Sequence, residues 1–291
     1  MQDNLSSGEA LQLIECPRDA MQGWQHFIPT EQKAEFLNQL LQVGFHTLDF
    51  GSFVSPKVIP QMKDTKEVLK RIHLQNTNTK LLAIVANVRG AKEAAQYDLI
   101  SYFGFPFSLS PTFQLRNTNA TIEESLQTVD AVQELCLKNN KTLIIYLSMG
   151  FGNPYGDDYN TDMLLHFTDV MAQKNISILS LSDTVGVATP EQISSAFSAL
   201  IPAYSQITFG AHLHTTKNNY QDKLRAALNA GCRRFDGALK GLGGCPMSGD
   251  ELVGNMPTEA MIAYLESLGW NTHINQNELS ESMLVAAKIF V

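Results

Sequence analysis

Short apolar runs alternate with longer amphipathic stretches from residue 11 to the end of the chain. Runs rich in β-branched and aliphatic residues are typical of buried strands, whereas apolar residues that recur every three or four positions are typical of helices with one buried face. The alternation occurs eight times, which predicts eight strands that are each followed by a helix. The strands are expected at 11–16, 46–50, 80–86, 99–103, 142–147, 176–182, 206–212 and 232–236, and the helices at 30–44, 64–73, 90–97, 121–139, 161–174, 190–201, 218–230 and 258–268.

Eight strand–helix units favour an α/β fold in which a parallel sheet closes into a (β/α)8 TIM barrel. An open doubly wound sheet usually has only about five or six strands. No Gly/Ser-rich or Pro-rich linker divides the chain. We therefore expect a single domain over residues 1–291, with the barrel at about 11–268 and a short helical extension at about 269–291.

The composition is that of an ordinary globular protein, with 44% hydrophobic and 17% charged residues. The formal net charge of -8 would repel a nucleic-acid duplex at long range, and no basic stripe offsets it. No run reaches the roughly 18 apolar residues of a membrane span. We expect neither a nucleic acid nor a membrane as a partner.

The four cysteines, Cys16, Cys136, Cys232 and Cys245, are scattered without Cys-x-x-Cys spacing. This spacing predicts neither a disulfide framework nor a zinc knuckle and fits a reducing compartment. The first residues are polar and match neither a secretory signal nor an Arg-rich transit peptide. The expected location is the cytoplasm.

Polar residues gather where the expected strands end. In a TIM barrel, the carboxyl ends of the strands and the loops after them form the working face. We therefore expect these residues to converge on one mouth of the barrel. They are Arg18, Asp19, Asp49, Ser52, Asp183, Thr184, His212 and His214, with Cys245 and Asn255 in the glycine-rich loop 237–257.

Two histidines close the seventh expected strand. His212 and His214 are two residues apart, so their imidazoles point to the same side of the strand. Together with Asp19 and the amide oxygen of Asn255 they could hold one divalent cation. Mixed oxygen and nitrogen ligands without a thiolate favour Mg²⁺ or Mn²⁺ and leave Co²⁺ or Zn²⁺ possible.

Each of these residues also has a structural interpretation. Arg18 and Asp19 could form a helix cap or a surface ion pair, and Asp183 and Thr184 could cap the next helix. Cys245 could be a small buried residue, although the glycines around it favour an exposed thiol. The other histidines lack paired spacing, and we assign them no role.

The motifs around these residues resemble those of the 3-hydroxy-3-methylglutaryl-CoA lyase family, metal-dependent TIM-barrel lyases related to Claisen-condensing enzymes. The resemblance covers nearly the whole chain, and Ser-Phe-Val-Ser-Pro-Lys at 52–57 and Gly-Leu-Gly-Gly-Cys-Pro at 241–246 are specific to the lyase branch. The other matching segments are Pro-Arg-Asp at 17–19 with Gln22, Pro-Gln-Met at 60–62, Ile-Glu-Glu-Ser at 122–125, Ser-Leu-Ser-Asp-Thr-Val-Gly at 180–186, His212-x-His214, and Gly-Asn at 254–255.

The resemblance implies that the protein cleaves 3-hydroxy-3-methylglutaryl-CoA into acetyl-CoA and acetoacetate, a reaction of leucine degradation and ketone-body formation. It implies a divalent metal, Mg²⁺ or Mn²⁺, an acyl-CoA substrate and a homodimer. It matches Asp19, His212, His214 and Asn255 to the metal ligands, Arg18, His212, Cys245 and Asp49 to the catalytic residues, and Gln22, Ser52, Ser180, Asp183 and Thr184 to the substrate-binding residues.

The implied roles are chemically consistent. Breaking the carbon–carbon bond requires loss of the hydroxyl proton and a sink for the electrons, which is the thioester. Arg18 would stabilise the enolate oxygen that develops there. Acid–base duties would fall to His212 and Cys245.

The sequence departs from the family pattern at several positions. Asp49 stands where the family usually has Glu, so its hydrogen bonds near Arg18 should be rearranged or bridged by water. Thr215 replaces an aspartate that would support the metal site. Asn153 stands in the segment Gly-Asn-Pro where the family has Gly-Cys-Pro, and Pro111 stands where it tends to have Glu. Substrate identity is therefore less constrained than reaction class.

Three alternatives remain open at this point. A condensing synthase of the isopropylmalate, citramalate or homocitrate type shares the barrel and the metal residues, but usually continues into a C-terminal accessory region. A 4-hydroxy-2-oxo acid aldolase would act without coenzyme A, and a catalytically silent barrel would only bind metal or acyl-CoA. Lys57, Arg116 and Lys240 are candidate contacts for the coenzyme A phosphates.

Overall fold

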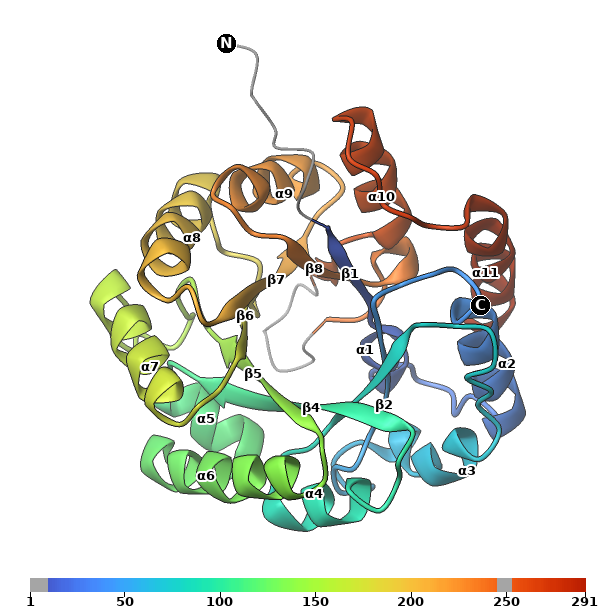
Figure 1. Ribbon diagram of the computed structural model, residues 1–291, viewed down its shortest axis with the longest axis horizontal. Coiled ribbons are helices and arrows are strands. Elements are labelled where there is room, and N and C mark those ends of the chain that lie inside the picture. The colour runs from blue at the N-terminus through green and yellow to red at the C-terminus, as the bar shows by residue number, and fades with distance from the viewer. Residues whose placement is uncertain (1–9, 245–252) are drawn as a thin grey trace.

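The computed structural model describes residues 10–244 and 253–291. Eight parallel strands form a closed barrel with helices around it (Figure 1). Consecutive strands are neighbours throughout, and pairing of the first strand with the eighth closes the ring, so the expected TIM barrel is confirmed. The strands are β1 (Gln12–Glu15), β2 (Thr47–Ser52), β3 (Lys80–Ile84), β4 (Ile100–Ser108), β5 (Thr142–Ser148), β6 (Ile178–Asp183), β7 (Thr208–Thr215) and β8 (Arg234–Gly237).

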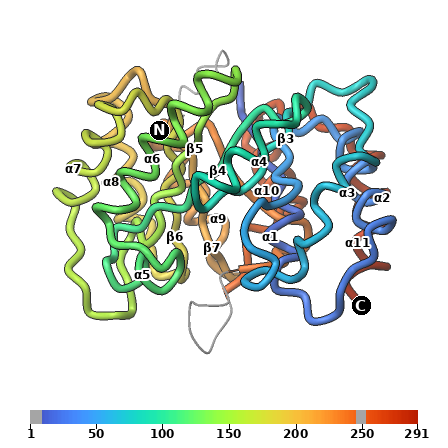
Figure 2. The backbone as a smooth tube through the Cα atoms, turned by 90° about the horizontal axis from the view of Figure 1, so that it is seen from below, coloured from blue at the N-terminus to red at the C-terminus, as the bar shows by residue number. Residues whose placement is uncertain are grey.

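The helices form the outer layer, seen from the side in Figure 2. All eight expected helices are present, although some are shorter than the sequence pattern predicts. The helices are α1 (Pro17–Gln22), α2 (Thr30–Leu40), α3 (Thr65–Leu69), α4 (Val88–Ala94), α5 (Pro111–Thr118), α6 (Ile122–Lys138), α7 (Thr161–Gln173), α8 (Pro190–Ala203), α9 (Tyr220–Asn229), α10 (Thr258–Ser267) and α11 (Gln276–Ile289), with short 3-10 helices η1 (Pro60–Met62) and η2 (Leu239–Gly241).

The segment 104–120, which lies between an expected strand and an expected helix and was therefore expected as a loop, forms regular structure instead. Strand β4 continues to Ser108 because it pairs with β5 along its whole extension, up to Ser148. Helix α5 follows, and the Ser110 side chain caps it by accepting a hydrogen bond from Phe113 N at 3.0 Å. The expectation of a loop was wrong because strand pairing is a tertiary effect that local sequence does not report.

The helices expected from residues 30, 121 and 190 begin at or within one residue of those positions, but only two of them have a side-chain cap. Thr121 and Thr189 each form a capping box with the residue three positions later. Thr30 lies inside α2 as its first residue and caps nothing; its hydroxyl donates to Asp64 Oδ2 at 2.8 Å. This contact ties α2 to the segment that precedes α3.

The main core lies between the outer faces of the strands and the surrounding helices. Inside the barrel, a small apolar cluster of Leu82, Ile144 and Tyr146 shares the space with polar side chains. Arg234 is fully buried there, and a Cβ atom on Gly210 would lie 3.1 Å from its Cδ. Glycine at position 210 therefore leaves room for a long charged side chain within the barrel.

The C-terminal extension packs on the barrel as expected. Helix α11 lies beside α2 in Figure 1, and the Phe290 ring contacts Trp24 and Phe36 edge-on, with centroid distances of 5.2 and 6.0 Å. The cysteines Cys16, Cys136 and Cys232 are buried and free. Among the helices described, none is both long and apolar enough to cross a bilayer.

Candidate active site

Three chain segments bring these polar residues to the carboxyl ends of the strands. Helix α1 follows β1 directly and carries Arg18 and Asp19. His212 and His214 lie near the C-terminal end of strand β7. A short strand, β9 (Gly254–Asn255), pairs antiparallel with the end of β7 and sets Asn255 opposite His214. The convergence on one mouth that the sequence predicts is therefore found for these residues.

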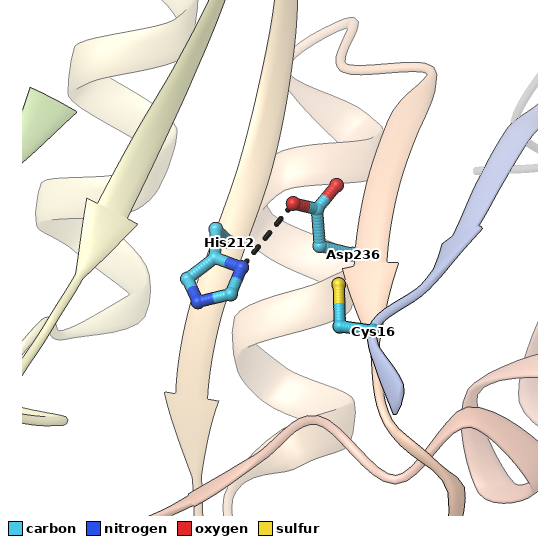
Figure 3. A group of neighbouring side chains, drawn as sticks. All are labelled: Cys16, His212 and Asp236. Atoms are coloured by element: carbon cyan, nitrogen blue, oxygen red, sulfur yellow. Dashed lines mark hydrogen bonds and ion pairs between the residues drawn. The ribbon is translucent and has the colours of Figure 1, made fainter. Parts of the chain in front are cut away.

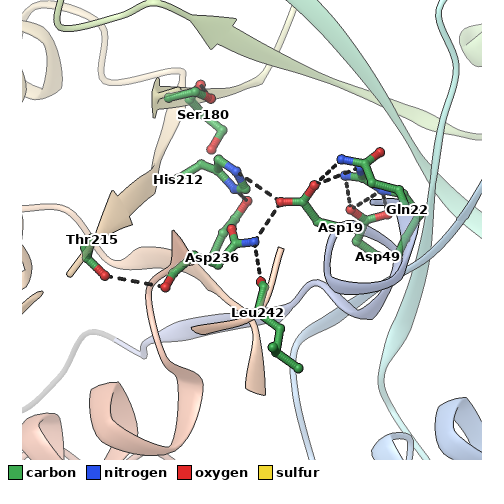
Figure 4. A network of polar contacts seen from close by, with 11 residues as sticks. Asp19, Gln22, Asp49, Ser180, His212, Thr215, Asp236 and Leu242 are labelled. Carbon is green, nitrogen blue, oxygen red and sulfur yellow. Dashed lines mark hydrogen bonds and ion pairs between the residues drawn. The ribbon is translucent and has the colours of Figure 1, made fainter. Parts of the chain in front are cut away.

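The Arg18 guanidinium is held by acidic and amide oxygens of Asp19, Gln22 and Asp49, which Figure 4 shows gathered in one network. Its Nη2 and Nε donate to Asp49 Oδ2 at 2.6 and 3.0 Å, and its Nη1 donates to Gln22 Oε1 at 2.9 Å and to Asp19 Oδ1 at 3.2 Å. The Gln22 amide also donates to Asp19. The shorter Asp49 thus reaches Arg18 directly, without the bridging water that the family comparison allowed for.

Three ligand atoms meet beside Arg18. One atom each from Asp19, His212 and His214 lie within 4.8 Å of one another. Both ring nitrogens of His214 are buried and have no hydrogen-bond partner among the described residues. A buried imidazole without partners, next to a carboxylate and a second imidazole, fits a divalent cation that would supply the missing contact.

Asp236 is a site residue that the sequence reading missed. Its Oδ2 lies 3.2 Å from His212 Nδ1 (Figure 3). This contact leaves the other nitrogen, Nε2, facing Asp19 Oδ2 at 3.9 Å. Carboxylates commonly orient metal-binding histidines in this way. Asp236 ends the expected strand 232–236, so the same strand-end rule that selected the other residues would have selected it.

A second group, Cys16 with His212 and Asp236, is also compact (Figure 3). It is a poorer metal site, because Asp236 already engages His212 Nδ1. Burial also raises the pKa of the Cys16 thiol well above its usual value, which disfavours the thiolate that metals require.

Asn255 contacts the cluster through the nitrogen of its side-chain amide. This nitrogen donates to Asp19 Oδ2 and to the Leu242 carbonyl, both at 2.8 Å. The structure therefore places Asn255 beside the predicted ligands, but with the nitrogen rather than the expected oxygen facing Asp19. Cys245, the predicted catalytic thiol, lies outside the described residues.

A cavity of about 170 Å³ opens onto these groups. Its polar wall includes Arg18, Asp19, Gln22, His212 and His214, and many of the other lining residues form an apolar wall. The remaining lining residues, mostly not anticipated from the sequence, are Val54, Val58, Ile59, Ile84, Ala86, Pro106, Phe113, Asn117, Thr118, Tyr146, Ser148, Ser182 and Thr184.

Of the other predicted substrate-binding residues, one lines the cavity and three do not. Thr184 lines the cavity, and its hydroxyl accepts a hydrogen bond from Met149 N at 2.9 Å. Ser52 and Ser180 are buried and do not line it. Asp183 is turned away from the cavity into an ion pair with Lys223, with Oδ2–Nζ at 2.6 Å.

Burial and neighbouring charges shift the pKa values of the site residues. Burial would raise the pKa of Asp19, but Arg18 and the two histidines lower it, so this side chain is available as a carboxylate ligand. Burial raises the pKa of Asp49 to about 6 despite the neighbouring Arg18. Burial and the nearby His212 lower the pKa of His214 to about 4, which keeps its imidazole neutral and able to bind a metal.

A second cavity, of about 550 Å³, adjoins the first, and Val54 lines both. We call it the basic pocket, because Lys63, Lys66, Arg89 and Lys92 line it and Glu93 is its one acidic residue. Lys66 pairs with Glu93. The pocket concentrates positive charge on a chain whose net charge is negative.

None of the three side chains predicted to contact coenzyme A lines either cavity. Lys57 is exposed, and the Arg116 guanidinium lies over the Tyr155 ring at 4.7 Å. Lys240, the third, lies in η2.

The family model described as HMGL-like matches residues 11–285. The chain belongs to the HMGL-like family. Hydroxymethylglutaryl-CoA lyase YngG of Bacillus subtilis is 34% identical over 272 residues, which are 94% of this chain and 89% of that protein. Human cytoplasmic 3-hydroxy-3-methylglutaryl-CoA lyase is 31% identical over 277 residues, 94% of this chain and 74% of that protein.

Solved HMGL-like structures share the whole architecture. The HMG-CoA lyase of Acinetobacter baumannii, solved with coenzyme A and 3-methylmalate, superposes with a TM-score of 0.89 at 28% identity. The match covers 97% of this chain and 91% of that one. The fold is therefore that of this family.

Proposed function

We propose that this protein is a metal-dependent carbon–carbon lyase that cleaves 3-hydroxy-3-methylglutaryl-CoA into acetyl-CoA and acetoacetate. The observation that carries the proposal is the position of Arg18, at one cavity wall with the Asp19–His212–His214 cluster. A cation site and a fixed guanidinium in one cavity suit a reaction in which an alkoxide collapses to a ketone and an enolate is released. The names of the relatives support cleavage rather than the condensing or aldolase alternatives.

Asp19, His212 and His214 would hold the divalent ion, with Asn255 beside them. When bound, the ion would orient the substrate hydroxyl and carboxylate and lower the pKa of the hydroxyl. The donor set of one carboxylate and two imidazoles, without a thiolate, favours Mg²⁺ or Mn²⁺. Asp236 keeps Nδ1 of His212 engaged, so that Nε2 faces the cation site.

Arg18 would stabilise the negative charge that develops on the thioester oxygen. Asp49 and Gln22 fix the guanidinium, so little reorganisation is needed when this charge appears. His212 and Cys245 would move the protons, from the hydroxyl and to the carbanion of acetyl-CoA. The assignment of Cys245 rests on the family resemblance alone.

The apolar wall would receive the non-reacting parts of the acyl chain. Ile84, Pro106 and Phe113 line the cavity and offer no hydrogen bond to the substrate's methyl group. The hydroxyls of Ser182 and Thr184 lie on the same lining and could contact the distal carboxylate. This division into a polar and an apolar wall suits a branched hydroxy diacid.

The basic pocket is our candidate for the coenzyme A phosphates. It adjoins the reaction cavity at Val54, and Lys63, Lys66, Arg89 and Lys92 give it a positive charge that phosphates would neutralise. Lys57, Arg116 and Lys240 line neither cavity and are less suited to this task. A homodimer, a cytoplasmic location and a part in leucine degradation and ketone-body formation stay predictions.

The test is a product analysis. Protein supplied with Mn²⁺ and 3-hydroxy-3-methylglutaryl-CoA is expected to yield acetyl-CoA and acetoacetate in equal amounts, measured by mass spectrometry. Consumption of acetyl-CoA with an oxo acid, and no cleavage, would instead identify a condensing synthase. Binding of Mn²⁺ without turnover of this thioester or of related 3-hydroxyacyl-CoA diacids would identify a silent barrel.

A further inference from the structure

Lys223 is buried behind the proposed metal cluster. It lies on α9, its side chain is only 2% exposed, and its ammonium group has three acceptors. It donates to Asp183 Oδ2 at 2.6 Å, to the His214 carbonyl at 2.9 Å and to the Gly186 carbonyl at 3.0 Å. All three donors of a lysine are thus satisfied by groups at the mouth of the barrel.

These contacts fall where the β6–β7 ladder has ended. The last paired residues of that ladder are Asp183 and Leu213, so the His214 carbonyl lies one residue beyond it. A buried carbonyl at a strand end needs another donor. Lys223 supplies that donor to His214, whose imidazole belongs to the cluster.

The third acceptor connects Lys223 to the element that carries Asn255. Gly186 has a φ of +73°, and a Cβ atom there would lie 2.8 Å from the Val253 side chain. Val253 directly precedes β9, which pairs His214 with Asn255. Lys223 therefore joins the end of β6, the end of β7 and the segment packed against β9.

We propose that Lys223 is a positioning residue for the metal cluster. Its hydrogen bonds fix the backbone of His214 relative to the loop after β6. The inference rests on the proposed function only in taking Asp19, His212 and His214 as the ligands. It also gives Asp183 the task of fixing the Lys223 ammonium group, in place of substrate contact. Thr215 stands where the family pattern has an aspartate, and the support of this strand end comes instead from a buried cation.

A matched ion pair elsewhere in the chain provides the control. Lys33 is also 2% exposed, and its Nζ lies 2.6 Å from Asp64 Oδ1, the same distance as in the Lys223 pair. Neither Lys33 nor Asp64 lines the cavity. Lys33→Met therefore removes a buried lysine from an equivalent pair and leaves the cluster untouched.

The experiment measures Mn²⁺ affinity by titration followed by electron paramagnetic resonance, without substrate. Loss of an outer support of a metal site typically costs 10- to 100-fold in affinity. We expect Lys223→Met to weaken Mn²⁺ binding by about that factor, and Lys33→Met to leave it within about twofold. Thermal unfolding of both variants reports their loss of stability.

A more conservative variant covers the case in which Lys223→Met does not fold. Lys223→Arg keeps the charge but changes the donor geometry, so we expect a folded protein with weaker Mn²⁺ binding. Wild-type affinity in whichever folded Lys223 variant is measured, or equal weakening in Lys33→Met, would overturn the positioning role. Absence of Mn²⁺ binding by the wild type would contradict the proposed metal site itself, so the two failures can be told apart.

Discussion

Asp49 accepts two hydrogen bonds from the guanidinium of Arg18, whose Nη2 and Nε both donate to the carboxylate oxygen Oδ2 at 2.6 and 3.0 Å. Because Asp49 is buried and contacts the substrate cavity only through Arg18, it should act through that residue. We expect Asp49→Asn to lower kcat by about 10-fold or more, as loss of an oriented charge partner does. In an Arg18→Gln background the same change should have almost no further effect.

A double-mutant cycle on kcat/KM measures this coupling. Additive losses in the two single variants and the double variant would show that Asp49 acts independently of Arg18. Circular dichroism of each variant would confirm that the barrel is intact before its rate constants are compared.

The histidine pair predicts a specific dependence on divalent metal. Treatment with a chelator should abolish turnover, and Mn²⁺ or Mg²⁺ should restore it. His214→Ala removes one predicted ligand and is expected to weaken Mn²⁺ binding by at least about 10-fold, measured by calorimetric titration. His166→Ala alters an exposed histidine on α7 and should bind Mn²⁺ like the wild type, so equal losses in both variants would argue against the assigned ligands.

Glu15 predicts a pH dependence of stability. Glu15 is the last residue of β1, and its carboxyl group accepts hydrogen bonds from Leu239 N at 2.9 Å and from the Thr258 hydroxyl at 2.5 Å. Burial raises its pKa from 4.5 to about 8. Between these values the folded protein retains a proton that the unfolded chain releases, so the free energy of unfolding should fall as the pH rises, by up to about 1.4 kcal/mol per pH unit.

Glu15→Gln keeps the side chain neutral and should remove that contribution. Urea unfolding at several pH values between 5 and 8 would show it as the difference in slope between the two proteins. Parallel curves for wild type and variant would mean that Glu15 does not retain the proton in the folded state.

The basic pocket predicts a binding effect that depends on the coenzyme A phosphates. Arg89→Glu should raise KM for 3-hydroxy-3-methylglutaryl-CoA several-fold and leave kcat nearly unchanged, because the pocket is separate from the reacting groups. The N-acetylcysteamine thioester of the same acid lacks the phosphates and should show no such change. Lys138→Glu, a change of the same sign at an exposed site on α6, is the control. An equal rise in KM for both thioesters would exclude this location.

The sequence predicted the barrel because its signal is repeated eight times, so an error in one strand does not change the fold. Arg18, Asp19, His212 and His214 could also be placed at one mouth of the barrel, since each lies at or just after a strand end and the fold brings strand ends together. Asp236 obeys the same rule and was overlooked in favour of the loop that follows it.

Other features could not be read from the sequence, because they depend on contacts between distant segments. Asp183 ends β6, where a site residue is expected, but its carboxylate pairs with Lys223 on α9 and does not line the cavity. The pairing of β9 with β7 involves only two residues of β9 and leaves no periodic signal. The apolar wall of the cavity likewise combines residues from strands, loops and a helix, which hydrophobicity alone would assign to the core.

The most direct test is a coupled assay for acetoacetate, comparing wild type with Arg18→Gln at saturating Mn²⁺ and 3-hydroxy-3-methylglutaryl-CoA. The account predicts metal-dependent product formation by the wild type, and a kcat lower by about 10²- to 10³-fold in the variant, as expected when a charge-stabilising donor is removed. A variant that releases acetoacetate at the wild-type rate would contradict the role given to Arg18 beside the metal cluster.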